Sequence, residues 1–123
     1  MSFTNKTVLI TGGTGFIGSQ LIKSLLAQNI NVICYGRSID KIKQKFGNTV
    51  IATNTLDCVK TDYIIHTACP TESKIMGHRP VEVIDAIYAL TKESLECAKQ
   101  NAARYLFLSS MEVYDNLSGY VNE

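Results

Sequence analysis

The chain has 123 residues, of which 46% are hydrophobic and 19% charged, and its formal net charge is +1. This length and composition suit one compact globular domain, and the near-neutral charge gives no broad basic field for nucleic acid or an anionic membrane. No apolar run approaches the roughly 20 residues that cross a bilayer, and no signal peptide is recognisable, so we expect a cytoplasmic protein.

Short apolar runs alternate with helical patterns along the first part of the chain. The first run, Thr7–Thr11, is almost continuously apolar, as is typical of a strand covered on both faces. After a glycine-rich segment, apolar residues recur at helical spacing over Phe16–Gln28. A second strand is expected at Val32–Tyr35. A short helix over Ser38–Phe46 would then have the serine as its N-cap.

The same alternation continues through the rest of the chain. We expect strands at Thr49–Ala52, Tyr63–Thr67 and Tyr105–Ser109, with a helix over Val81–Ala102 that has Pro80 in its first turn. The alternation predicts an α/β fold of the Rossmann type, a doubly wound parallel sheet with helices on both faces. Right-handed crossovers favour the strand order 3-2-1-4-5 in a single domain over residues 1–123. Its ligand would bind at the carboxyl ends of the strands, where the chain order reverses.

The segment Thr11–Gly18 (TGGTGFIG) lies directly between the first strand and the first helix. Its early glycines let the backbone turn sharply and approach a pyrophosphate, while the last one lets the helix pack against the strand. A tight turn without a ligand is the alternative, but strand, loop and helix together favour a dinucleotide site at a helix N-terminus. The cofactor-binding residues predicted in this segment are Gly12, Thr14, Gly15, Phe16, Ile17 and Gly18.

The end of the second strand indicates which dinucleotide binds. NAD sites usually carry an acidic residue there for the ribose hydroxyls, but Tyr35–Ser38 (YGRS) has none. Arg37 could pair with a 2′-phosphate in the bidentate geometry that a guanidinium favours, the alternative being a solvated surface arginine. The sequence therefore favours NADP over NAD.

The cysteines and His66 offer little further chemistry. None of the four cysteines forms a C-x-x-C pair, so we expect reduced, mostly buried thiols, without a disulfide framework or a metal site. His66, at the end of a strand, is expected to be a packed residue and not a catalytic one. The cysteines are Cys34, Cys58, Cys69 and Cys97.

Three segments together resemble one family: Thr11–Gly18, Asp62–Ala68 (DYIIHTA) and Leu108–Tyr114 (LSSMEVY). In order and spacing they are similar to the extended short-chain dehydrogenase/reductases, specifically the NAD-dependent epimerase/dehydratase family that acts on nucleotide sugars. The resemblance covers the whole chain but only the N-terminal part of a typical member. It implies an NAD(P)-binding portion of an epimerase, dehydratase or reductase, with hydride transfer at a sugar carbon in the full-length enzyme.

The resemblance also implies individual roles. Thr67 and Ala68 would lie beside the cofactor ribose. Ser110 matches the family's serine or threonine that hydrogen-bonds the sugar oxygen being oxidised or reduced. Glu112 matches a position that is acidic in dehydratases and is a further catalytic candidate. Met111 stands where dehydratases have an aspartic acid, which makes dehydration less expected.

Hydride chemistry in the family depends on a Tyr-x-x-x-Lys pair on a later helix, in which the lysine lowers the pKa of the tyrosine. Tyr120 lies too close to Ser110 for this role, and the sequence given ends at Glu123 before such a lysine. We therefore expect a truncated chain that binds the cofactor without completing the reaction. A non-catalytic NADP(H)-binding module and a vestigial remnant without a ligand are the alternatives.

The predicted helix over Val81–Ala102 is apolar around most of its circumference, which indicates that it is covered on more than one side. One side would face the sheet. In the family that the chain resembles, the other side packs against the helix with the Tyr-x-x-x-Lys pair and against a partner subunit. In this chain that other side would lack a cover, and the predicted fifth strand would be a bare sheet edge. The chain is therefore expected to self-associate as a homo-oligomer or to be marginally stable.

Overall fold

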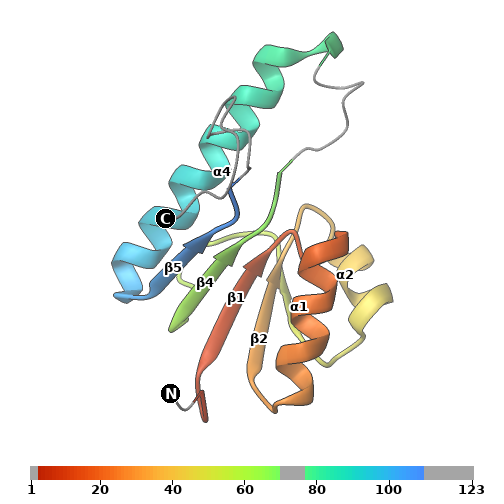
Figure 1. Cartoon of the computed structure of the whole chain (residues 1–123), viewed down its shortest axis with the longest axis vertical. Coiled ribbons are helices and arrows are strands. Elements are labelled where there is room, and N and C mark those ends of the chain that lie inside the picture. Colours follow the sequence, from red (N-terminus) through yellow and green to blue (C-terminus); the bar gives the residue numbers. More distant parts are fainter. Residues whose placement is uncertain (1–2, 70–76, 110–123) are drawn as a thin grey trace, which may run out of the picture.

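A parallel sheet of five strands forms the middle layer, in the order β3-β2-β1-β4-β5 (Figure 1). The structure, a computed structural model, describes residues 3–69 and 77–109. The strands are β1 (Thr7–Thr11), β2 (Asn31–Tyr35), β3 (Ile51–Thr53), β4 (Tyr63–His66) and β5 (Arg104–Phe107). The helices are α1 (Phe16–Ala27), α2 (Ile39–Phe46) and α4 (Pro80–Asn101). The predicted Rossmann-type topology and strand order are confirmed.

The central strand β1 is buried on both faces, as its apolar run predicts. Val8 and Ile10 belong to the core cluster beneath α1 and α2, together with Ile22 of α1. Leu9, between them in the sequence, points to the opposite face and packs in the cluster beneath α4. Figure 1 shows the same division, with α1 and α2 on one face of the sheet and α4 on the other.

The helix α2 begins and ends at the residues that its sequence indicates. The Ser38 side chain accepts a hydrogen bond from the Lys41 N–H at 3.3 Å, and Asp40 lies in the first turn, where the helix dipole favours an acid. Strand β3 starts two residues later than we expected, at Ile51 and not Thr49. The reason is local: the backbone N–H and the hydroxyl of Thr49 both donate to the Phe46 carbonyl, which holds Thr49 in the turn after α2.

The long helix α4 packs on β4 and β5 and leaves an apolar stripe on its outer side. Its first turns project beyond the carboxyl ends of the strands (Figure 1). Cys97 and Ala98 face the sheet and are buried in the core. The residues of the outer stripe are exposed, and they are Val81, Ile84, Tyr88 and Leu95.

The other face of β4 and β5, on the α1 side, has an apolar groove of about 340 Å³. Strand β5 is also the edge strand of the described sheet, and its Leu106 side chain is half exposed. The expected open edge is therefore present. The groove is lined by Phe3, Val8, Leu25, Tyr63, Ile64, Ile65, Arg104, Tyr105 and Leu106.

The four cysteines are not joined in disulfides, and two are buried and two exposed. Cys34 and Cys97 lie in the core, and burial raises the pKa of Cys34 to about 11. Cys58 and Cys69 are exposed, so the expectation of mostly buried thiols is wrong for these two; Cys69 lies beyond the end of β4, outside the packed strands.

Within residues 3–69 and 77–109, no helix is both long and apolar enough to cross a bilayer. The same residues contain no group of three or more His, Cys, Asp or Glu side chains that could hold a metal ion. A cytoplasmic location remains a prediction.

Burial of the thiols predicts a reactivity pattern. The native chain treated with a thiol-alkylating reagent at neutral pH should be modified at Cys58 and Cys69. Cys34 and Cys97 should be protected, because the thiolate is the reactive form and these thiols are buried with raised pKa values. Peptide mass spectrometry measures the modification, with the denatured chain as the control in which all four react. Rapid alkylation of Cys34 in the native chain would contradict the fold.

Candidate functional site

The glycine-rich loop makes a tight turn between β1 and α1. Gly12 has a φ of 73°, a left-handed conformation that glycine adopts without strain. The Gly15 N–H donates to the Gly12 carbonyl at 3.0 Å and closes the turn. Helix α1 then begins at Phe16, with Gly15 as its N-cap.

The loop packs so closely against its neighbours that three of its glycines, Gly12, Gly13 and Gly18, have no room for a Cβ, and at Gly12 and Gly18 the obstacle includes backbone. A Cβ at Gly12 would lie 2.8 Å from the Ala68 backbone nitrogen and 2.8 Å from the Thr67 Oγ1. A Cβ at Gly18 would overlap the Gly12 carbonyl oxygen. These close approaches bring the start of α1 against the carboxyl ends of β1 and β4, where a dinucleotide pyrophosphate would need access to the backbone.

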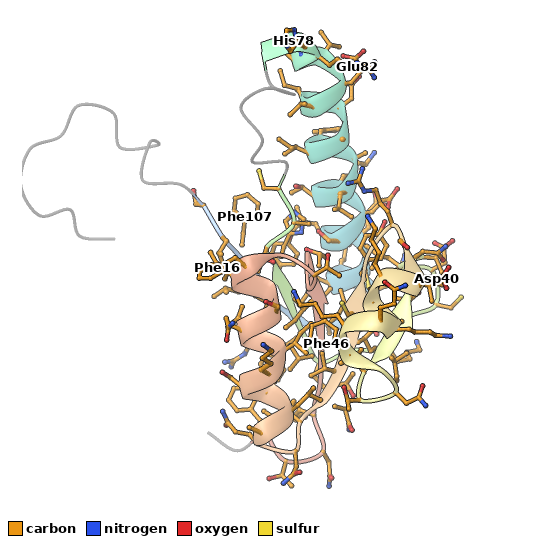
Figure 2. The ribbon with its side chains drawn as sticks, turned by 90° about the vertical axis from the view of Figure 1, so that its right-hand side faces the viewer. Phe16, Asp40, Phe46, His78, Glu82 and Phe107 are labelled. Atoms are coloured by element: carbon orange, nitrogen blue, oxygen red, sulfur yellow. The ribbon has the colours of Figure 1, made fainter. Side chains whose placement is uncertain are left out.

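The start of α1 has the properties of an anion site. It has no acidic residue in its first turn and no side-chain cap, so its first N–H groups are available to a ligand. The loop tip, Thr14–Ile17, is exposed. Figure 2 shows Phe16 projecting from the first turn of α1, where it is 85% exposed. The Lys45 ammonium donates to the Thr14 carbonyl at 3.1 Å and adds a positive charge beside the loop. The backbone and charges here therefore fit a pyrophosphate.

Hydrogen bonds join the ends of β1 and β4 directly below the loop. The Thr11 carbonyl accepts from the Thr67 hydroxyl at 2.7 Å, and the Thr11 hydroxyl accepts from the Ala68 N–H at 3.3 Å. The His66 Nδ1 lies 2.6 Å from the Thr11 Oγ1, and its Nε2 lies 3.2 Å from the Thr91 Oγ1 of α4. The structure thus brings Thr67 and Ala68 against the glycine loop, and their place beside the cofactor ribose stays a prediction.

His66 is a packed residue at the end of a strand, which confirms that expectation. Its side chain is only 2% exposed, and its ring stacks on Phe107 with centroids 5.6 Å apart. Burial lowers its pKa, so the ring is neutral at neutral pH. The two threonine contacts were not foreseen, because they join residues that are far apart in the sequence.

Two opposite charges flank the end of β2. Burial and the negative charge of Glu93 raise the pKa of Tyr35, and the positive charge of the exposed Arg37 lowers it. The two raising effects are larger, so the pKa of Tyr35 lies above its usual value. Glu93 reaches this point from α4 and lines a cleft of about 390 Å³ with Tyr35 and the carboxylate residues Asp57 and Glu96. Sequence reasoning could not find this acid, because it inspected only the residues that follow β2.

One further pattern in the sequence was missed. Tyr88 and Lys92 have the Tyr-x-x-x-Lys spacing, but on α4 and before Ser110. Tyr88 is 68% exposed on the outer stripe of α4, and the described structure gives neither side chain a hydrogen bond to the glycine loop. The two catalytic candidates, Ser110 and Glu112, lie outside the described residues and stay predictions.

Comparisons with known proteins agree with this geometry. The model of the NAD-dependent epimerase/dehydratase family matches residues 8–122. UDP-glucuronic acid decarboxylase 6 of Arabidopsis thaliana is 32% identical over 121 residues, which are 90% of this chain and 35% of that protein. The chain thus spans about a third of the length of this relative.

Two solved structures share the fold. The ADP-L-glycero-D-manno-heptose-6-epimerase of Helicobacter pylori superposes with a TM-score of 0.78 at 24% identity, covering 95% of this chain and 43% of that one. The UDP-glucose 4-epimerase of Bifidobacterium longum, in complex with NAD+ and UDP, gives a TM-score of 0.70 at 25% identity, covering 89% and 38%.

The close approach at Gly18 predicts a severe effect of a single methyl group. Gly18→Ala should lower the free energy of unfolding by about 1–3 kcal/mol, because its Cβ overlaps the Gly12 carbonyl and must displace backbone. Chemical denaturation measures the change. Gly77→Ala is the matched control, since a Cβ there would meet no atom within 4 Å. Equal stability of the two variants would contradict the described loop.

Proposed function

Because the chain belongs to the NAD-dependent epimerase/dehydratase family, we propose that it forms the dinucleotide-binding part of an enzyme that acts on a nucleotide sugar. One observation carries the proposal: an exposed, uncapped helix start without acidic residues, held by glycines against the carboxyl ends of β1 and β4. The chain spans about a third of the relative it matches, so the reaction belongs to a longer protein in this proposal.

The cofactor would lie across the glycine loop. Backbone N–H groups of Phe16, Ile17 and Gly18 would bind the pyrophosphate, with Thr14 and Gly15 at the tip of the loop. When bound, the cofactor would supply a hydride acceptor and donor for a sugar carbon.

The carboxyl end of β4 would form the wall beside the cofactor ribose. The Thr67 hydroxyl already donates to the Thr11 carbonyl and the Ala68 N–H to the Thr11 hydroxyl, so both residues would shape this wall through their fixed positions.

The substrate class follows from the relatives in this proposal. The similarity to a UDP-glucuronic acid decarboxylase makes a UDP-uronic acid the first substrate to test. Ser110 would hydrogen-bond the sugar oxygen, with Glu112 as a second polar group and no acid at Met111.

A second candidate function is a non-catalytic module that binds NADP(H) without turning over a sugar. It is favoured by the position of Tyr88 and Lys92, the one Tyr-x-x-x-Lys pair in the sequence, on the outer side of α4. Incubating the longer protein that this proposal assigns the reaction to with UDP-glucuronic acid and the dinucleotide separates the two candidates, because the 123-residue chain alone is expected to bind without turnover in both. Product formation would support an enzyme, and cofactor binding without product would support the module.

The charges at the end of β2 set the cofactor preference. We propose NADP, with Arg37 pairing with the 2′-phosphate; the competing arrangement is NAD, with Glu93 accepting from the ribose hydroxyls. Arg37→Met should weaken NADPH binding by about 10- to 100-fold, the size of a lost charge-assisted contact, and leave NADH binding unchanged.

Fluorescence titration with both dinucleotides measures this difference. Arg104→Met is the control, because Arg104 is an exposed arginine at the opposite end of the sheet, where β5 begins. Tighter binding of NADH than of NADPH to the unaltered chain would refute the role of Arg37. Binding of neither dinucleotide would refute the proposed function.

We also propose that a second copy of the chain covers the outer stripe of α4. The four apolar residues of the stripe lie on one side of the helix, with the exposed Lys92 between Tyr88 and Leu95, and an exposed apolar patch of this kind marks an interaction surface. This arrangement would form the predicted homo-oligomer and leave the glycine loop outside the interface.

A single charge in the stripe should separate the copies. Tyr88→Glu should raise the dissociation constant of the oligomer by about 10-fold or more, because truncating or charging a buried aromatic anchor removes a large share of the binding free energy. Light scattering over a concentration series measures it. Gln100→Glu adds the same charge on another side of α4 and should have no effect. A chain that is monomeric at all concentrations would refute this interface.

A further inference from the structure

A row of hydrogen bonds crosses the carboxyl end of the sheet from the glycine loop to α4. It runs from the Ala68 N–H to the Thr11 hydroxyl, then to His66 and finally to Thr91. The middle of the row is closed to solvent, because Thr11 is fully buried and His66 is 2% exposed. A buried row of polar groups is stable only if each member has a partner.

The neutral imidazole ring is the form that satisfies this row. One ring nitrogen of a neutral histidine donates and the other accepts. In either tautomer, therefore, one of the two threonine hydroxyls donates to the ring and the other accepts from it. A protonated ring donates from both nitrogens, so the threonine that had been donating must turn its proton away inside the protein.

Thr11 connects this row to the loop, because it is the residue directly before Gly12. The Thr11 hydroxyl accepts from the Ala68 N–H, and the Thr11 carbonyl accepts from the Thr67 hydroxyl, so both groups bind the segment that follows β4. A Cβ at Gly12 would lie 2.8 Å from an atom of each of these two residues, so Gly12 packs directly against both of them. A rotation of the Thr11 side chain would therefore break its bond to the Ala68 N–H and loosen Ala68, against which Gly12 packs.

We propose that His66 is a positioning residue for the dinucleotide loop: by holding the Thr11 hydroxyl, it sets the distance between Gly12 and Ala68. Through Thr91, the orientation of its ring depends on α4. The inference rests on the proposed dinucleotide function. It adds a residue that would touch neither cofactor nor substrate and act through Thr11.

The surroundings of the ring contain one other titratable group among the described contacts. β1 contributes Thr11 and α4 contributes Thr91, neither of which titrates, while β5 contributes Tyr105 and Phe107. Burial raises the pKa of Tyr105, so this phenol stays neutral at and below neutral pH. The described contacts of the ring include no carboxylate to stabilise its cationic form.

Two substitutions at His66 separate its hydrogen bonds from its packing. His66→Phe keeps a ring that can stack on Phe107 but removes both nitrogens. His66→Asn keeps an amide near the position of Nδ1, within reach of Thr11. Isothermal titration of NAD+ should show affinity reduced by about 5- to 10-fold in His66→Phe, the size of one lost hydrogen bond, and largely restored in His66→Asn.

A matched pair on α4 controls for general destabilisation. Thr91→Val removes the hydroxyl that contacts His66, whereas Ser94→Ala removes a buried hydroxyl that is bonded to Tyr105. Both substitutions cost a hydrogen bond in the same helix, but we expect only Thr91→Val to weaken NAD+ binding. Equal affinity in all four variants would overturn the inference and leave the proposed function intact.

Amide hydrogen exchange tests the positioning role without any ligand. The amides of residues 12–18 should exchange faster in His66→Phe than in the unaltered chain or in Ser94→Ala. If the unaltered chain binds no dinucleotide, the proposed function fails. The exchange measurement then still tests whether His66 holds the loop, because it needs no ligand. Unchanged exchange in His66→Phe overturns that role.

The pH dependence of binding gives a readout that a merely structural role would not produce. Because the site requires the neutral ring, the affinity for NAD+ should fall as the pH is lowered from about 7.5 to about 5.5, through and below the ordinary range of histidine. Since burial lowers the pKa of His66, most of the loss of affinity should occur toward the acidic end of this pH range. The dependence should be absent in His66→Asn. An affinity that rises on acidification in the unaltered chain would indicate a cation that attracts the phosphates, and would overturn the inference.

Discussion

The close approach of α1 to the end of β1 is the contact on which the rest of the site depends. The Gly12 carbonyl accepts from the Gly15 N–H to close the turn, and the same carbonyl leaves no space for a Cβ at Gly18. Since backbone meets backbone here, the start of α1 points at the carboxyl end of the sheet. The candidate anion site at the start of α1 follows from this contact, while hydrogen bonds from Thr67 and Ala68 to Thr11 join β1 to β4 beside it.

Charge is distributed unevenly around that contact. Lys45 donates to the Thr14 carbonyl beside the loop, whereas the cleft on the other side of Tyr35 is lined by Asp57, Glu93 and Glu96. An anionic ligand is therefore favoured over the loop and disfavoured in the cleft. Arg37 and Glu93 both act on Tyr35 at the end of β2, which is why the proposed cofactor preference rests on the balance between them.

Local patterns in the sequence predicted most of the fold. The apolar run Thr7–Thr11, the cap at Ser38 and the glycines after β1 each act through neighbours in the chain, so their consequences can be derived from short segments. Element ends were predicted less well, as at Thr49, where two hydrogen bonds to Phe46 delay β3. Contacts between distant residues, such as that of His66 with Thr91, have no signature in a short segment.

A parallel sheet with a dinucleotide-type loop at Thr11–Gly18 could be derived from the amino-acid order alone, because strand, turn and helix propensities are local. Which side chains meet at that loop became visible only in the folded chain. It brought Glu93 to the end of β2 and aligned Thr11, His66 and Thr91 in one buried row. The contact of Thr11 with His66 depends on the pairing of β1 with β4, and the contacts of Glu93 and Thr91 depend on how α4 crosses the sheet. Neither arrangement is specified by the order of residues in a short segment.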